Sequence, residues 1–151
     1  MGLEPLQWFS TEEGLPSQPT VLQIRHGTKA FVSTANRVLL VKEQHTDGSP
    51  FWTLPGGGVK ANESLAECLT RELFEELRCQ AVIDKPVTTV WYAHSSKQKT
   101  FSVYTVFECS LLSIPESNER EGILEYQWLS PTSLPPTTLP QIRQIVESRS
   151  R

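Results

Sequence analysis

The sequence has few cysteines, and this shortage excludes two classes of small protein. Only Cys68, Cys79 and Cys109 occur among 151 residues, and no two of them have the C-x-x-C spacing. An odd number of cysteines without that spacing gives neither a disulfide framework nor a zinc knuckle. We therefore expect reduced thiols in a cytoplasmic protein.

Basic charge and long apolar runs are also scarce. The formal net charge is −3, whereas proteins that bind bulk nucleic acid or anionic membranes carry a basic excess. No apolar run is long enough to cross a membrane, and the first residues give neither a secretory signal nor a myristoylation site. With 38% apolar and 21% charged residues, the composition is that of a globular chain. A small phosphorylated ligand is compatible with this charge, because it needs only a few local cations or a metal ion.

The chain divides into an arm and one domain. Residues 1–20 are polar with three prolines, so we interpret them as an N-terminal arm, and residues 21–149 as a single domain. Strands are predicted in TVLQIR, TKAFVST, NRVLLVKEQ, FWTL, CQAVID, VTTVWYAHSS, KTFSVYTVFECSLL and LEYQWLS. Gly27 is expected to separate the first two strands, TAN to form a hairpin turn, and PGGG to form a loop. With one strong central helix and a C-terminal helix in LPQIRQIVESRSR, this order predicts an α/β fold with a mixed sheet.

The central helix has a clear start and an apolar face. Ser64 is its expected N-cap, and Glu67 completes a capping box. Apolar residues recur at the helical period and predict a buried stripe: Ala66, Leu69, Leu73 and Leu77.

Three carboxylates, those of Glu72, Glu75 and Glu76, border this stripe. Neighbouring acids that are partly buried repel each other and lose hydration, so they require cations. Mg²⁺ or Mn²⁺ is the simplest partner, because such ions are held by one or two carboxylates with water and substrate phosphates. A solvated acidic face is the alternative for these residues taken alone. The glycines upstream favour a metal site, since they let a carbonyl point inward and a phosphate approach closely.

The acids belong to a longer pattern of fixed spacing. Its members are Gly57, Glu63, Arg71, Glu72, Leu73, Glu75, Glu76 and Cys79. The pattern resembles the Nudix box, G-x5-E-x7-R-E-U-x-E-E-x-G-U with U apolar. The sequence differs from the box only at its last glycine, where this chain has Arg78. The likeness extends over about Val21 to Val146 and implies the Nudix fold, an α/β/α sandwich with a mixed central sheet.

The resemblance also implies an activity. Nudix proteins cleave a pyrophosphate bond in a nucleoside diphosphate linked to another group, with Mg²⁺ or Mn²⁺. Nucleoside triphosphates, ADP-ribose, nucleotide sugars and dinucleoside polyphosphates stay open as substrates, and so does a homodimer. Carried over by position, the implied metal ligands are Glu72, Glu76, Glu75 and the carbonyl of Gly56. Glu63 and Arg71 would pair and fix the loop against the helix.

Further residues are candidates for the remaining roles. The general base is open among Glu76, Glu75, Glu119, Glu121, Glu125 and His94. Candidate phosphate contacts are Lys42, Gly57, Gly58, Lys97 and Lys99. Candidates for stacking on a base are Trp52, Trp91, Tyr92, Tyr104 and Trp128, with core packing as the alternative for each.

Two other functions occur on this kind of fold. A nucleotide-binding sensor without turnover usually lacks box carboxylates, whereas this chain keeps all of them. An isomerase of isoprenoid diphosphates goes with a degenerate box. The box glycine that Arg78 replaces ends the helix in a left-handed conformation, where another residue costs about 1 kcal/mol. We expect Arg78 to affect the helix end and not the reaction, since a cation at a helix C-terminus is favourable.

Overall fold

The computed structural model describes residues 3–5, 22–94 and 100–149. Within them, the strands form one sheet in the order β1-β6-β7-β2-β3-β4, with β5 beside β2 and β8 beside β3. The elements are β1 Leu3–Pro5, β2 Gln23–Thr34, β3 Arg37–Gln44, β4 Pro50–Thr53, β5 Gly56–Gly58, α1 Leu65–Leu77, β6 Ala81–His94, β7 Thr100–Leu111, η1 Glu119–Glu121, β8 Glu125–Leu129 and α2 Pro140–Arg149. The sheet is mixed, because β2 and β7 run parallel while β2 and β3 run antiparallel.

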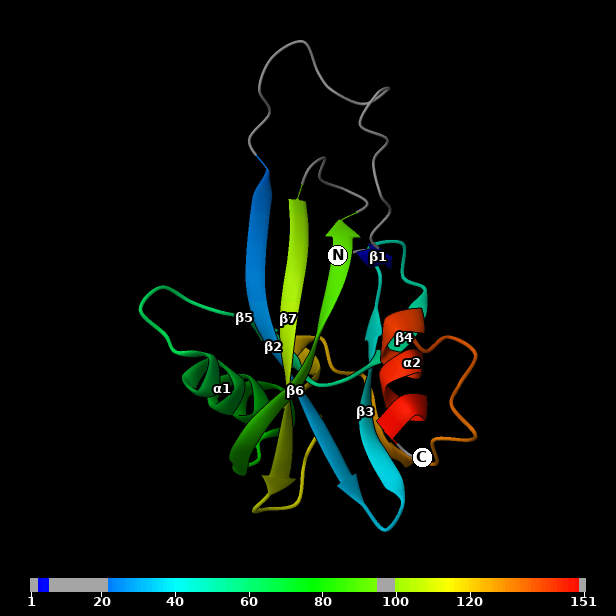
Figure 1. The fold of residues 1–151 in the computed structure, drawn as a ribbon. Coiled ribbons are helices and arrows are strands. Elements are labelled where there is room, and N and C mark those ends of the chain that lie inside the picture. The colour runs from blue at the N-terminus through cyan, green and yellow to red at the C-terminus, as the bar shows by residue number, and fades with distance from the viewer. Residues whose placement is uncertain (1–2, 6–21, 95–99, 150–151) are drawn as a thin grey trace.

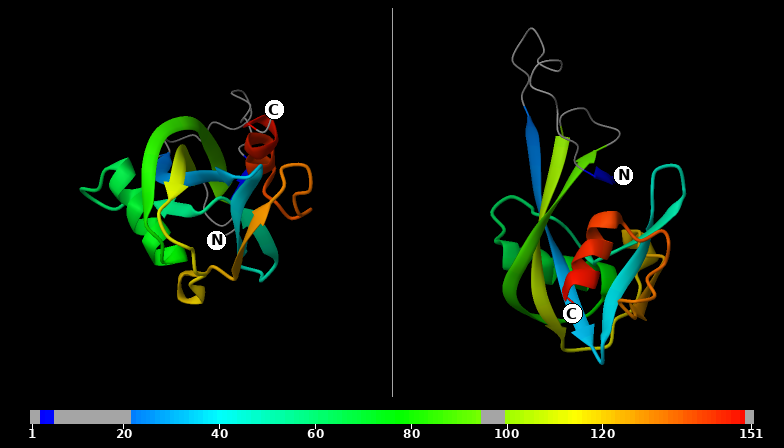
Figure 2. Two further views of the ribbon diagram at one scale, coloured as in Figure 1. Left: turned by 90° about the horizontal axis from the view of Figure 1, so that it is seen from below. Right: turned by 45° about the vertical axis from the view of Figure 1, so that its right-hand side comes forward.

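The two helices lie on opposite sides of the strands (Figures 1 and 2). Successive side chains of a strand point to opposite faces, so a strand between two layers is apolar on both. Along β2, Ala30 and Val32 pack in the core under α1, whereas Phe31 packs in the core under α2. Along β3, Leu39 faces the α1 core and Leu40 the α2 core. The predicted α/β/α sandwich with a mixed sheet is confirmed.

A tight turn joins β2 to β3, as the TAN signal predicts. Its residues Ala35 and Asn36 have φ angles of 50° and 62°. Two central residues with positive φ are typical of the type I′ hairpin, whose twist matches that of the flanking strands. Ser33 pairs with Val38, and Thr34 with Arg37, directly beside this turn.

Two glycine signals were misinterpreted from the sequence. The expected break at Gly27 is wrong, because β2 continues through it. A Cβ on Gly27 would lie 2.6 Å from ring atoms of Tyr104, so this glycine provides room for an aromatic ring and does not end a strand. The expected loop at PGGG is also wrong in part, since Gly56–Gly58 forms β5 and pairs antiparallel with β2.

A third correction concerns β6. The segments CQAVID and VTTVWYAHSS were expected as separate strands, but Ala81–His94 is one strand. Its register with β7 shifts between Ile83 and Thr88, around Pro86. Proline has no N–H to give to a ladder, which explains an irregularity in place of a break. Strand β1 pairs with the end of β6, and the other residues of the expected arm lie outside the described residues.

Helix α1 has the predicted start and most of the predicted stripe. The Ser64 side chain accepts from the Glu67 N–H, and the Glu67 carboxylate accepts from the Ser64 N–H, which confirms the capping box. Leu69, Leu73 and Leu77 are fully buried as predicted: all three have 0% exposure. Ala66 is exposed, so its place in the stripe is wrong. The buried side of α1 begins at Cys68, whose thiol lies 3.2 Å from the Thr28 hydroxyl.

The remaining expectations for the described residues concern the thiols, α2 and the membrane. All three cysteines are free, as expected, and the structure shows that they are also buried. Helix α2 confirms the C-terminal helix and begins at Pro140, where the fixed φ of proline suits the first helical position. Neither α1 nor α2 has the length and apolar character needed to span a membrane.

Candidate functional site

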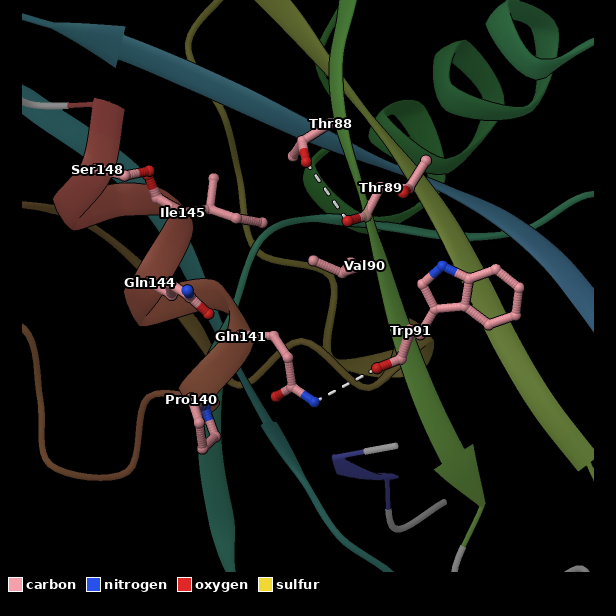
Figure 3. A pocket seen from close by; sticks show the side chains of 9 residues that line it. All are labelled: Thr88, Thr89, Val90, Trp91, Pro140, Gln141, Gln144, Ile145 and Ser148. Carbon is pink, nitrogen blue, oxygen red and sulfur yellow. Dashed lines mark hydrogen bonds between the residues drawn. The ribbon is translucent and has the colours of Figure 1, made fainter. Parts of the chain in front are cut away.

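Two cavities are candidates for the functional site, and they differ in the charge of the side chains that line them. One, of about 620 Å³, lies between β6 and α2, and Figure 3 shows neutral side chains around it. We call it the neutral groove; the residues that line it include Thr88, Thr89, Trp91, Gln141, Gln144 and Ser148. The other has a volume of about 310 Å³, and we call it the charged cavity. Its lining includes basic and acidic side chains: Arg25, His26, Lys29, Glu43, Glu72 and Glu76. Phosphates and metal ions require charged partners, so the charged cavity is the candidate site.

The glycines of β5 bring its backbone against α1. Gly56 donates its N–H to Oε1 of Glu76 over 2.8 Å. Gly56 has a φ of +146°, and a Cβ there would collide with the Thr28 carbonyl oxygen. A Cβ on Gly57 would lie 2.5 Å from the Cδ of Glu72. Gly56 is therefore required for the close pairing of β5 with β2, and Gly57 for the close contact of β5 with Glu72 of α1.

Arg71 joins this strand to the helix. Its Nε and Nη2 donate to the two carboxylate oxygens of Glu63 over 2.7 and 3.0 Å, and Nη2 also donates to the Gly58 carbonyl over 2.9 Å. Its Nη1 donates to Glu72 Oε1 and Glu75 Oε2 over 2.9 and 3.1 Å. The hydrogen bonds from Arg71 lower the pKa of Glu63 to about 2. Arg71 thus fixes the chain after β5 and also holds two acids of α1.

Two carboxylates of the charged cavity, those of Glu72 and Glu76, have raised pKa values. Glu76 is 5% exposed, and burial raises its pKa well above the usual range, with a further contribution from the charge of Glu43. Burial also raises the pKa of Glu72, although its hydrogen bond from Arg71 opposes the shift. The cavity therefore contains acids whose charged forms lack full compensation, and added positive charge would stabilise them.

The donor set suits a hard divalent cation. Among the described residues, no three histidine, cysteine, aspartate or glutamate side chains already converge as a metal centre. Mg²⁺, however, usually takes only one or two carboxylates and completes its shell with water and phosphate. Glu72, Glu76 and Gly56 line the same cavity. Within the described part of the chain, Oε2 of Glu72 and Oε2 of Glu76 accept no hydrogen bond, so each is free for a cation.

Several sequence candidates lie elsewhere. Glu75 does not line the charged cavity, and its carboxylate is bound to Arg71. Lys42 is also absent from the lining, and its ammonium lies 6.0 Å from the centre of the Trp52 ring. Three candidate bases in and after η1 are likewise absent from it: Glu119, Glu121 and Glu125. Lys97 and Lys99 lie outside the described residues. The backbone of His94 belongs to β6, but its side chain is outside the described part of the structure.

The five aromatic candidates for stacking on a base lie in different parts of the structure. Trp52 and Tyr92 are buried in the core under α2, and Trp128 packs against the core under α1. Trp91 lines the neutral groove. Tyr104 is the one member of this set that lines the charged cavity.

Sequence reasoning missed Lys29 and Glu43. Strand alternation could have found Glu43, because Leu39 and Val41 pack under α1 and the next residue of that face is Glu43, not Lys42. Lys29 could have been found as a charge inside the apolar run of β2, between the fully buried Thr28 and Ala30. It is itself only 5% exposed.

The structure of the C-terminal end of α1 was also predicted only in part from the sequence. Arg78 adopts the left-handed conformation, with φ 48° and ψ 35°, and its N–H donates to the Phe74 carbonyl over 2.9 Å. A segment distant in sequence supplies further donors to the last turn. Asn118 donates its backbone N–H to the Glu76 carbonyl over 3.0 Å and its side-chain amide to the Glu75 carbonyl over 2.8 Å. These bonds satisfy carbonyls that a helix end leaves without partners.

Comparison with known proteins agrees with this geometry. The sequence pattern of the NUDIX domain matches residues 24–148. The chain belongs to the NUDIX domain family. Nucleoside triphosphatase NudI of Escherichia coli O139:H28 is 31% identical to this NUDIX protein over 91 residues, which cover 55% of this chain and 64% of NudI. The match thus spans less than two thirds of the length of that relative.

Solved structures show the same fold. The solution structure of the E. coli ORF135 protein has a TM-score of 0.72 at 20% identity, covering 85% of this chain and 89% of that one. The crystal structure of a MutT NUDIX hydrolase from Burkholderia pseudomallei has a TM-score of 0.70 at 23% identity, covering 83% of this chain and 97% of that one.

Proposed function

We propose that this NUDIX protein is a divalent-metal-dependent hydrolase that cleaves a pyrophosphate bond of a nucleotide. The observation that carries the proposal is that the half-buried Glu72 and the buried Glu76 line, together with the β5 glycines, a cavity that also holds cationic side chains. Nucleoside triphosphates are the first substrate class to test, because the relative NudI is named a nucleoside triphosphatase. ADP-ribose, nucleotide sugars and dinucleoside polyphosphates follow. The nucleotide would bind to one domain over residues 21–149.

The proposed mechanism assigns a task to each residue. Glu72, Glu76 and the Gly56 carbonyl would hold Mg²⁺ or Mn²⁺. When bound, such an ion neutralises charge on the phosphate oxygens and lowers the pKa of attacking water. Arg71 keeps the Glu72 carboxylate turned to the cavity through its 2.9 Å hydrogen bond.

The general base stays within the glutamates of α1 in this proposal. Glu76 is the first candidate, because its carboxylate lines the charged cavity. Glu75 is the alternative base, and it would first have to leave Arg71, which holds it over 3.1 Å.

The experiment measures phosphate and nucleotide release from these four substrate classes with Mg²⁺ or Mn²⁺, for wild type and Glu76→Gln. We expect turnover of one class and a loss of roughly 10²-fold or more in the variant, about 2.7 kcal/mol of transition-state stabilisation. If no compound is cleaved while a nucleotide still raises the melting temperature, the protein is a nucleotide-binding module without turnover.

A further inference from the structure

Lys29 is a buried cation that the proposed mechanism does not use. It lies on β2, where it pairs with Gly56 of β5. Its side chain lines the charged cavity together with Glu72 and Glu76. In the part of the chain that the structure describes, no carboxylate lies within the 4 Å of an ion pair with its ammonium.

A buried ammonium of this kind needs a nearby anion. Removing a charge from water costs several kcal/mol unless direct partners replace the hydration. Lys29 shares the lining of the charged cavity with Glu43, Glu72 and Glu76. Its three donors nevertheless lack a directly bound carboxylate among the described residues.

The local structure is built to hold this ammonium at the cavity. Gly27 and Tyr104 are Cα partners in the parallel ladder of β2 and β7. Because Gly27 has no Cβ, the Tyr104 ring packs directly over its backbone. Lys29 is two residues further along β2 and so on the same face. Its Nζ lies 4.8 Å from the centre of the Tyr104 ring, at the distance of a cation–π contact.

We propose that Lys29 binds a phosphate oxygen of the substrate, as a fixed cation beside the carboxylates of Glu72 and Glu76. The inference rests on the proposed function and extends it to a residue outside the Nudix box. An ammonium binds phosphate as a compact point charge with three donors. At this place it neutralises charge on the pyrophosphate from the side of β2, while α1 supplies the carboxylates from the other side.

The test separates phosphate binding from metal binding, and it needs no turnover. Lys29→Met keeps the length of the side chain and removes its charge. Mn²⁺ affinity is measured first without nucleotide, and pyrophosphate affinity is then measured at saturating Mn²⁺. We expect Mn²⁺ affinity to be unchanged or higher, because a like charge is lost, and pyrophosphate affinity to fall about 10-fold or more.

Kinetics and matched variants complete the experiment. With the substrate that the panel of four nucleotide classes identifies, Lys29→Met should lower kcat/KM by roughly 10²-fold. This is the usual effect of removing one charged donor. Lys29→Arg keeps the charge and should retain more pyrophosphate affinity than Lys29→Met. Lys85→Met is the control, because Lys85 is 68% exposed on β6 and its weak ion pair with Glu108 is 3.9 Å long. It should leave all constants within about twofold.

Two results would overturn the inference. Pyrophosphate affinity close to wild type in Lys29→Met would show that Lys29 only offsets the charge of the acids. A parallel loss of Mn²⁺ and pyrophosphate affinity would show that it only supports the site. If Lys29→Met does not fold, the ammonium ¹⁵N signal of Lys29 in the wild-type chain must shift on addition of pyrophosphate with Mg²⁺. Absence of turnover in the wild type would instead contradict the proposed function, and the binding measurements would still decide the role of Lys29.

Discussion

The charged cavity and the neutral groove differ in volume and in the charge of the side chains that line them. The groove is the more voluminous, at about 620 Å³ against about 310 Å³. Its described lining is uncharged, and Gln141 closes one side by donating to the Trp91 carbonyl over 3.3 Å (Figure 3). The charged cavity instead buries Glu76 and Lys29, each at 5% exposure.

The volume of a cavity depends on how the elements around it pack, whereas charged side chains buried in a cavity indicate a function. A neutral gap between β6 and α2 requires no compensating interaction. Buried charges oppose folding, so a chain that keeps several of them around one cavity keeps them for a ligand. Substitutions in the charged cavity should therefore change activity, whereas substitutions in the neutral groove should change stability at most.

The largest expected effect is at Glu76. Without metal, Glu76→Gln should raise the free energy of unfolding by about 1–2 kcal/mol, because it removes a buried charge next to Glu43. That corresponds to roughly 3–6 °C in melting temperature. Saturating Mn²⁺ should stabilise the wild type by about 2–3 kcal/mol and the variant much less. Thermal unfolding with and without Mn²⁺ measures both, and equal stabilisation of the two proteins would exclude Glu76 as a ligand.

Gly57 should show the second largest effect. In Gly57→Ala the new Cβ would lie 2.5 Å from Cδ of Glu72, so the carboxylate must move while Arg71 holds it. A displacement of this size at a reacting centre reduces activity by up to about 10²-fold, and we expect a smaller effect on stability. Gly58→Ala is the matched comparison, since its Cβ would meet nothing closer than 4.0 Å. Equal losses in the two variants would show that backbone freedom, and not the contact with Glu72, is what matters.

The pair of Glu63 and Arg71 should make the stability of the fold depend on pH. The pKa of Glu63 is about 2 in the folded chain, below the ordinary value of 4.5, mainly because of hydrogen bonds from Arg71. A lowered folded-state pKa stabilises the fold above the unfolded-state pKa, and this stabilisation disappears as pH falls toward the folded-state pKa. Glu63→Gln should therefore lower the melting temperature at pH 7, and the difference from wild type should shrink between about pH 5 and 2. A difference independent of pH would mean that the charge of Glu63 does not matter.

The neutral groove should respond little to substitution. Gln141→Ala removes one long hydrogen bond and a side-chain oxygen without a partner in the described residues. We expect a change in stability of less than about 1 kcal/mol, because these two losses partly offset each other. Activity on the identified nucleotide should be unchanged. A large loss of activity would show that the groove takes part in the reaction, contrary to the comparison above.

Local chemistry in the sequence predicted much of this molecule. The capping box, the hairpin turn and the leucines of α1 follow from contacts within a few residues, and the spacing of the Nudix box placed Glu72 and Glu76 on one side of a helix. What failed depends on contacts between distant segments. Gly27 was interpreted as a break because the ring that it accommodates, Tyr104, is 77 positions further along the chain.

In the candidate site, too, the predictions failed where a residue's position depends on contacts between distant segments. Lys42 was chosen as a phosphate contact because it ends a strand, but alternation along β3 directs Glu43 toward the charged cavity. Lys29 could not be assigned to the cavity without the pairing of β2 with β5. The donors from Asn118 to the end of α1 come from a loop whose path no local signal indicates.

Arg78, outside both cavities, should give the smallest effect. Its φ of 48° favours glycine, so Arg78→Gly relieves about 1 kcal/mol of backbone strain, while the added freedom of the unfolded chain cancels part of this gain. The lost contact with Asn118 is 3.5 Å long and therefore weak. We expect the melting temperature to rise by about 0–3 °C and the activity to be unchanged. Arg78→Lys keeps the strain and should show no rise. A marked loss of activity in Arg78→Gly would show that the end of α1 controls the position of Glu76, whose carbonyl Asn118 also holds.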